Sequence, residues 1–290
     1  MTLIDRAVRP AQCAALPALS SETATAVEPG HRNPLAKSKH IEVCLHGDVE
    51  YRKSTGLEDF ELVNQALPEL SLDQIDLSAT LAGKMIAAPL MIAPMTGGTE
   101  QGREINCTLA RAAQRFRIPF SVGSQRVAIE DPARAATFDV RKHAPDCVLF
   151  ANFGAAQLVR GWGVTQARRA VEMLRADALF IHINPIQEAI QGGDCDFRGF
   201  AARLSALCRD LASEGIPVFA REICFGLSLA AARMLVECGV AGIDCAGAGG
   251  TSWARVEALC AKTEARREIG LRFGEWGIPT SRSILNVREV

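Results

Sequence analysis

Residues that could do chemistry follow the apolar run Ala178–Ile181. The stretch His182-Ile-Asn184-Pro-Ile-Gln187-Glu188 brings an imidazole, amides and a carboxylate close together. An apolar run that ends abruptly in such a cluster is typical of a buried strand whose carboxyl end opens into a polar pocket. A lone buried histidine is more often a hydrogen-bonded core residue, and a lone glutamate after a strand often caps a helix. Asn184 and Glu188 beside His182 favour a functional site.

Polar or glycine-rich turns also follow other apolar runs along the chain. They are Pro94-Met-Thr-Gly-Gly98, Ser124-Gln-Arg126, Asn152-Phe-Gly154, Arg221-Glu222 and Ala246-Gly-Ala-Gly-Gly-Thr-Ser252. Amphipathic helical segments separate them, which predicts right-handed βαβ units and a parallel sheet. Because a polar turn follows nearly every strand, we expect a TIM (β/α)8-type barrel with one shared active face rather than an open doubly wound sheet. Gly97-Gly98 alone does not match the dinucleotide-binding fingerprint of a Rossmann fold.

The predicted strands cover residues 89–93, 120–123, 147–151, 178–183, 217–220 and 241–245. They make about six strand-helix units, whereas a closed barrel of this type has eight. We therefore expect an incomplete barrel, apparently truncated at the C-terminus. The helix after Thr99 is predicted to bury Ile105, Leu109, Ala112 and Phe116 on one face. Residues 60–77 are predicted to cover the barrel mouth or to form edge strands.

Composition and patterning set the domain organisation and exclude some functions. Residues 1–33 lack a sustained hydrophobic period, so we expect a mobile N-terminal extension before a barrel domain at 34–290. With 32 basic and 33 acidic residues, the chain has no global field for nucleic acid or an anionic membrane. The 10 cysteines form no CxxC pair and no signal peptide precedes them. This predicts a cytoplasmic protein in which all the cysteines are reduced packing residues.

Four motifs together carry a resemblance to a known family. They are Ala88-Pro-Leu-Met-Ile-Ala-Pro-Met-Thr-Gly-Gly98, Ser124-Gln-Arg126, His182-x-Asn-x-x-Gln-Glu188 and Gly247-x-Gly-Gly-Thr251. In this order the chain resembles type II isopentenyl-diphosphate isomerase, an FMN-dependent TIM barrel, from about Ala36 to the C-terminus. The resemblance implies isomerisation of isopentenyl diphosphate to dimethylallyl diphosphate in isoprenoid biosynthesis. It also implies reduced FMN as the acid/base, Mg2+ on the diphosphate, NADPH to reduce the flavin, and a homo-oligomer.

Carried over by position, the resemblance also implies roles for individual residues. The implied FMN contacts are Met95, Thr96, Gly97, Ser124, Asn152, Arg221 and Thr251. The implied substrate-binding residues are Lys37, His40, Ser124, Gln125, Arg126 and Gln187. Gln187 and His182 are the implied catalytic residues, and Glu188 is the implied Mg2+ ligand. These residue types suit a diphosphate, because arginine forks to two phosphate oxygens and a hard cation bridges phosphate to carboxylate.

The sequence departs from the family pattern in three places. Ala36 stands where an arginine that grips the diphosphate is usual, so Lys37 and His40 could equally be a plain solvated helix start. Arg221 stands where a lysine contacts the flavin. The loops after strands seven and eight, which hold the FMN phosphate in such barrels, have no counterpart, so we expect weak FMN retention. Two alternatives therefore stay open: an impaired or inactive truncated homologue, and an FMN-dependent 2-hydroxy acid oxidoreductase.

Overall fold

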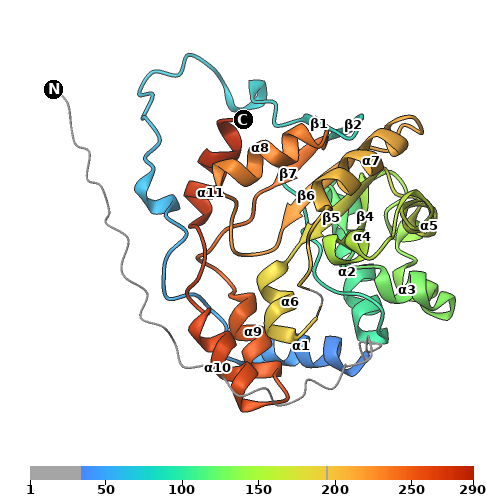
Figure 1. The fold of residues 1–290 in the computed structure, drawn as a ribbon. Coiled ribbons are helices and arrows are strands. Elements are labelled where there is room, and N and C mark those ends of the chain that lie inside the picture. The colour runs from blue at the N-terminus through green and yellow to red at the C-terminus, as the bar shows by residue number, and fades with distance from the viewer. Residues whose placement is uncertain (1–33, 194) are drawn as a thin grey trace. The chain divides into compact units, whose positions relative to one another are not determined.

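The central element is a five-stranded parallel sheet with the strand order β3-β4-β5-β6-β7 (Figure 1). The computed structural model describes residues 34–193 and 195–290; the predicted extension at 1–33 lies outside them. The strands are β3 (Phe120–Ser121), β4 (Leu149–Gly154), β5 (Ala178–Ile183), β6 (Val218–Glu222) and β7 (Gly242–Asp244). Each strand pairs with the next one in the chain, as expected for successive βαβ units. The predicted incomplete barrel is confirmed as a parallel half-barrel.

The predicted first strand, residues 89–93, is wrong as a strand. Ile92 makes a single parallel bridge to Phe120 at the edge of the sheet. Proline has no backbone N–H to donate to a ladder, and Pro89 and Pro94 stand on either side of this bridge. The segment therefore extends the half-barrel by one bridge position only.

Helices connect the strands, and the last three helices follow the final strand. They are α2 (Glu100–Phe116), α3 (Arg126–Glu130), α4 (Ala155–Val159), α5 (Val164–Leu174), α6 (Pro185–Gln191), α7 (Phe200–Ala212), α8 (Leu229–Glu237), α9 (Trp253–Cys260), α10 (Glu264–Arg272) and α11 (Thr280–Arg288), with α1 (Pro34–His46) before the sheet. The 3-10 turns are η1 (Leu57–Asp59), η2 (Leu72–Gln74), η3 (Pro132–Phe138) and η4 (Arg141–His143). Thr99, Ser228 and Ser252 cap α2, α8 and α9 by accepting a hydrogen bond from a backbone N–H in the first turn.

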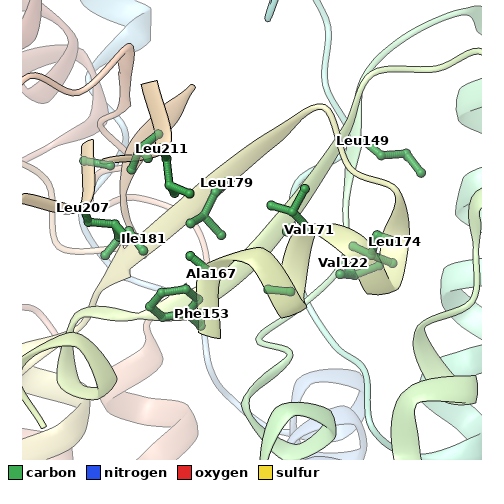
Figure 2. Close-up of a cluster of buried hydrophobic side chains, with 14 of the residues drawn as sticks. Val122, Leu149, Phe153, Ala167, Val171, Leu174, Leu179, Ile181, Leu207 and Leu211 are labelled. Atoms are coloured by element: carbon green, nitrogen blue, oxygen red, sulfur yellow. The ribbon is translucent and has the colours of Figure 1, made fainter. Parts of the chain in front are cut away.

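The outer face of the sheet packs on helices and forms the main core. Figure 2 shows Leu149 and Phe153 of β4 and Leu179 and Ile181 of β5 gathered with side chains of α5 and α7. The helical partners labelled there are Ala167, Val171 and Leu174 of α5 and Leu207 and Leu211 of α7. Because side chains alternate across a strand, the residues between them point to the other face of the sheet.

The inner face carries an aromatic floor. Phe150 of β4 and Phe180 of β5 stack with ring centroids 4.4 Å apart, and Phe219 of β6 meets the Phe150 ring edge-on at 5.1 Å. An antiparallel hairpin, β1 (Ala79–Leu81) with β2 (Lys84–Ile86), closes this end by packing Ile86 into the same cluster. The aromatic floor therefore fills the amino end of the half-barrel.

Two further expectations about the fold are wrong. Helix α2 buries Gly102, Asn106, Cys107, Ala110 and Ala113, whereas the predicted face is only partly covered and Phe116 is 60% exposed. Small side chains let the helix lie close against its neighbours. A search of the sequence for large apolar residues does not find such a face. Residues 60–77 form no strand, so the edge strands predicted there are wrong; the segment contains η2 and is exposed throughout. Its role as a cover over the barrel mouth stays a prediction.

The packing role that sequence analysis predicts for all the cysteines is wrong for Cys44 and Cys195, because both are exposed. No helix of the described residues is long and apolar enough to cross a membrane.

Candidate active site

A polar layer lies above the aromatic floor, at the carboxyl ends of the strands. Asn152, His182 and Arg221 each follow a floor phenylalanine by two positions, so they face the same side of the sheet. In the strand register His182 lies opposite Arg221, which lies opposite Asp244. In each of these strands, apolar residues are followed by one polar residue that points inward. These polar residues are neighbours in the strand register and form one continuous polar surface.

Hydrogen bonds join neighbouring members of this layer. His182 Nδ1 lies 2.8 Å from Asn152 Oδ1, and because an amide oxygen only accepts, this contact puts the imidazole proton on Nδ1. A Cβ at Gly154 would lie 2.6 Å from His182 Nε2, so only glycine leaves room for this ring. The Arg221 guanidinium donates to the Asp244 carboxylate and lies 5.9 Å from the Phe180 ring centroid. Burial lowers the pKa of Arg221.

The start of α6 gathers oxygen atoms beside this layer. Asn184 Nδ2 donates to Gln187 Oε1 at 2.8 Å and to Glu188 Oε1 at 3.1 Å. Asn184 Oδ1 is buried and has no hydrogen-bond partner in the structure. Glu188 is itself 4% exposed. A buried acceptor without a partner next to a buried carboxylate is the arrangement that a hard cation would complete.

Glu257 of α9 links this group to helix α1. Its Oε1 accepts hydrogen bonds from Gln187 Nε2, at 2.6 Å, and from Gln191, and it lies 3.3 Å from His40 Nε2. Burial alone would lower the pKa of His40, but hydrogen bonds to Cys260 and Glu257 and their charges raise it to about 9. His40 therefore carries a positive charge at neutral pH and stands close to the predicted catalytic Gln187.

Two positively charged side chains, those of Lys37 and Arg126, lie near the carboxyl end of β3. Lys37 Nζ donates to the Ser124 carbonyl at 3.3 Å and lies 5.8 Å from the Phe138 ring centroid. A Cβ at Gly98 would be 3.5 Å from the same Nζ. Arg126, at the first position of α3, has a side chain 14% exposed and lies 3.8 Å from Glu130. Helix α1 thus places Lys37 next to the glycine turn at Gly98 and next to Ser124 of the Ser-Gln-Arg motif.

Three predicted site residues have surroundings that differ from those expected of a binding site. They are Gln125, Met95 and Thr251. Gln125 is fully buried, and its amide donates to the Ala170 carbonyl and accepts from the Asn152 N–H. It therefore braces β4 against α5, and its side chain is not available to a substrate. Met95 is 57% exposed. Thr251 is exposed and makes an antiparallel bridge to Glu50. The Thr96 carbonyl accepts from Gly123 N and Asn106 Nδ2, which fixes the turn before Gly97.

A cavity of about 610 Å³ lies next to this region, but it is not formed by the predicted site residues. Its walls include Ile183, Glu222, Phe225 and Trp276. Glu222 follows Arg221 and so points to the opposite face of β6. The polar layer at the strand ends, and not this cavity, brings the predicted residues together.

Two residues that sequence reasoning missed hold the site together. Asp244 is the partner of Arg221, and Glu257 is the acceptor for Gln187. A signal existed for Glu257, because it falls three residues after Ala254 and directly before Ala258, both buried in α9. A carboxylate within the buried stripe of a helix needs partners, which marks it as a member of a polar network.

The residues fit both groups that the sequence resemblance implies. Asn184 Oδ1 and Glu188 offer oxygen ligands to a divalent cation, while the described residues contain no group of three His, Cys, Asp or Glu side chains that could hold a metal alone. A cation there would take its remaining ligands from phosphate or water. For a flavin, the half-barrel offers amide and guanidinium groups from Asn152 and Arg221 above the aromatic floor. Such a mixture of apolar surface and a few polar groups suits a planar heteroaromatic ring.

Comparison with known proteins decides the family. The isopentenyl-diphosphate delta-isomerase of Nostoc sp. is 48% identical over 256 residues, which are 88% of this chain and 72% of that protein. The isopentenyl-diphosphate delta-isomerase of Xanthobacter autotrophicus is 49% identical over 255 residues, 87% of this chain and 73% of the relative. The chain belongs to the type II isopentenyl-diphosphate delta-isomerase family.

A third relative and two broader comparisons give the same picture of similarity. The isopentenyl-diphosphate delta-isomerase of Methanothermobacter thermautotrophicus is 42% identical over 255 residues, 87% of this chain and 70% of its own length. Residues 44–144 match the broader family described as FMN-dependent dehydrogenase. Among solved structures, an active chimera of (S)-mandelate dehydrogenase aligns at a TM-score of 0.45 and 15% identity, over 72% of this chain and 67% of that one. The sequence resemblance to the type II isomerases is confirmed.

Proposed function

We propose that the protein isomerises isopentenyl diphosphate to dimethylallyl diphosphate. The observation that carries this proposal is the network that joins Gln187 and Glu188 of α6, through Glu257, to His40 of α1. Through this network, the oxygen atoms that would bind a metal ion lie beside positively charged side chains at one end of the half-barrel. A diphosphate with a short apolar tail needs that combination. The relatives favour this activity over oxidation of a 2-hydroxy acid.

The diphosphate would bind between α1 and the turns after β3. Lys37 is held over the Ser124 carbonyl, and His40 is charged because its neighbours raise its pKa to about 9. Arg126 is the residue in this group that can fork to two phosphate oxygens. Each charge-assisted hydrogen bond to a phosphate is worth about 1.5–3 kcal/mol, so these side chains together would bind the headgroup tightly.

A magnesium ion would sit between Glu188 and the bound diphosphate. Asn184 already uses its Nδ2 on Gln187 and Glu188, so its unpartnered Oδ1 is the natural second protein ligand. Mg2+ prefers one or two protein oxygens and completes its shell with phosphate and water. The cation would then compensate the negative charge of buried Glu188.

The reaction needs a proton added at one carbon and another removed two carbons away. Reduced FMN, when bound, supplies the acid/base group for these transfers. Gln187 is uncharged and acts by position: with its amide held by Asn184 and Glu257, it presents a fixed polar edge towards the alkene. Asn152, His182 and Arg221 would hold the flavin ring, and the aromatic floor would keep water out from below. NADPH as the reductant and a homo-oligomeric assembly stay predictions.

An isomerase assay with reduced FMN and Mg2+ tests the proposal. Glu188→Gln keeps the shape of the side chain but removes the negative charge, so we expect the Mg2+ concentration for half-maximal activity to rise at least about tenfold. Glu268→Gln is the matched control, because that carboxylate is exposed on α10 and pairs with Arg272 of the same helix. It should change the Mg2+ requirement less than about twofold.

Two outcomes would contradict the proposed function. If the wild-type chain gives no product with reduced FMN and Mg2+, the alternative of an inactive homologue is favoured. If Glu188→Gln and Glu268→Gln need the same Mg2+ concentration, Glu188 is not a cation ligand.

A further inference from the structure

The proposed reaction does not use the cavity of about 610 Å³ beside the polar layer. The cavity lies between α6, α8 and the turn that precedes α11. Most of its walls are apolar, and the residues that form them include Ile183, Pro185, Ile186, Phe225, Leu227, Ala231, Trp276 and Ile278. The polar side chains among its walls are those of Lys53, Glu222, Ser228 and Glu275. Apolar walls with a few fixed polar groups are typical of a small-molecule site.

Two of the charged side chains in these walls are held by other parts of the protein. Lys53 Nζ donates to the Gly277 carbonyl at 3.2 Å. The Glu275 carboxylate accepts the backbone N–H groups of Arg52 and Lys53, and it pairs with Arg255 at 2.8 Å. Both groups therefore have fixed positions and partners of their own.

The third charged side chain, that of Glu222, is in a different situation. It is 4% exposed, and no cation in the described part of the chain pairs with it; Arg221 pairs with Asp244 on the other face of the sheet. The backbone N–H groups of residues 224–226 all donate to Oε2 of Glu222. These bonds orient the carboxyl group but bring no full positive charge to it. A buried carboxylate is stable in its ionised form only with such a charge nearby, so this one favours a cationic ligand.

Two aromatic residues in the same walls are also suited to a cation. Phe225 is buried, whereas Trp276 is 58% exposed although it lines the cavity. The Trp276 ring meets Phe273 edge-on with centroids 5.8 Å apart, and the Tyr51 hydroxyl donates to the Trp276 carbonyl at 2.8 Å. The face of an aromatic ring attracts ammonium groups, and the indole of tryptophan attracts them most strongly. Trp276 is therefore a fixed aromatic surface that a cationic ligand can reach.

We propose that this cavity binds a small apolar amine in its ammonium form. The ammonium group would bind the carboxylate of Glu222 through Oε1, and the apolar part would lie along Ile186 and Leu227 beside Trp276. The charges in the walls favour this sign, because two carboxylates and one lysine leave a net negative charge that repels an anion. The inference does not rest on the proposed isomerase function, since the cavity and the polar layer lie on opposite faces of β6.

A ligand-observed NMR titration of the full chain with phenethylamine at about pH 8 tests the proposal. At that pH the carboxyl group of Glu222, whose pKa burial raises to about 7, is mostly ionised, and a primary amine still carries its proton. We expect a Kd of about 1 mM or below. Phenethyl alcohol has the same ring and chain without the charge, so it should bind at least about tenfold more weakly.

Three variants locate the binding site. Glu222→Gln keeps an acceptor for the three N–H groups but removes the charge, so it should weaken phenethylamine at least about tenfold and phenethyl alcohol less than about twofold. Ala231→Phe fills the cavity from α8 and should weaken both compounds. Glu264→Gln is the matched control, because this exposed carboxylate of α10 pairs with Arg267, and both affinities should stay unchanged.

Several results would overturn the proposal. They are no phenethylamine binding up to about 10 mM, equal affinities of the wild type for the amine and the alcohol, and an unchanged amine affinity in folded Glu222→Gln. An unchanged affinity in Ala231→Phe would place the amine outside this cavity. Circular dichroism shows whether each variant is folded. If Glu222→Gln does not fold, the comparison of amine with alcohol in the wild type and in Ala231→Phe decides the question.

Discussion

Arg221 and Glu222 show how one position along a strand separates two environments. Arg221 points to the inner face, pairs with Asp244 and lies beside the aromatic floor. Glu222 points to the outer face, where its Oε2 accepts the backbone N–H groups of Cys224, Phe225 and Gly226. Burial, partly offset by these hydrogen bonds, raises the pKa of Glu222 to about 7. The two neighbouring ionisable groups therefore do not form a pair.

Glu222 should make the stability of the protein depend on pH. Its pKa is higher in the folded chain than in the unfolded chain, so ionisation favours unfolding as pH rises from about 4.5 to about 7. Glu222→Gln cannot ionise, and over this window the free energy of unfolding of the wild type should fall by about 3 kcal/mol relative to the variant. Urea unfolding of both proteins at several pH values measures this difference. A constant difference across the window would contradict the raised pKa.

Among the connecting elements, the loop at η4 depends on one buried arginine. Arg141 is 7% exposed and donates to the carbonyls of Ala144, Cys147 and Leu174 and to Asp177. It thus joins the loop before β4 to the end of α5, just before β5. The same Asp177 accepts the N–H of Leu149 and pairs with Lys84 of the hairpin at 2.6 Å. These contacts fix the positions of the amino ends of β4 and β5. They therefore also fix the positions of Asn152 and His182 further along the same strands.

Arg141→Met should be strongly destabilising. The methionine removes one of the two cations that pair with Asp177, the other being Lys84, and it leaves buried carbonyls without donors. This costs about 3–5 kcal/mol of unfolding free energy. Arg168→Met is the matched control: Arg168 is half-exposed and pairs on the surface with Glu214, so its loss should cost less than about 1 kcal/mol. Urea unfolding midpoints compare the two. Equal losses would mean that Arg141 does not brace the strands.

At the scale of the whole half-barrel, the site depends on long-range order. Lys37 and Glu257 come from opposite ends of the described chain, yet both contact groups beside the strand ends. Such a site exists only in the folded state, so a ligand that binds there must stabilise the fold by mass action.

FMN should therefore raise the unfolding temperature. At a free concentration about 100 times its Kd, FMN adds about 2.7 kcal/mol, which for a domain of this size is a shift of about 5 °C or more. Circular dichroism melts with FMN measure it, and AMP, which carries a phosphate without a flavin ring, is the control. An FMN melt that coincides with the AMP melt at every concentration would favour the alternative of an inactive homologue.

Local patterns in the sequence were enough to predict an incomplete barrel with parallel strands, and to predict which strand ends carry polar groups. Apolar runs ending in Asn152, His182 and Arg221 could be located because alternation and strand ends are local properties of the chain. The family motifs could be recognised for the same reason. The family resemblance predicts site roles for Lys37, Gln187 and Glu188. The structure places all three at the same end of the sheet.

Which of these residues contact one another follows from the packing of distant segments and not from the local sequence. Glu257 contacts His40 and Gln187 from far along the chain, and Gln125 turns its amide into the core, because packing between α9, α1 and α5 is set by side-chain volumes that no local pattern encodes. Local spacing fixes the strand ends, whereas contacts between distant segments form only when the whole core closes.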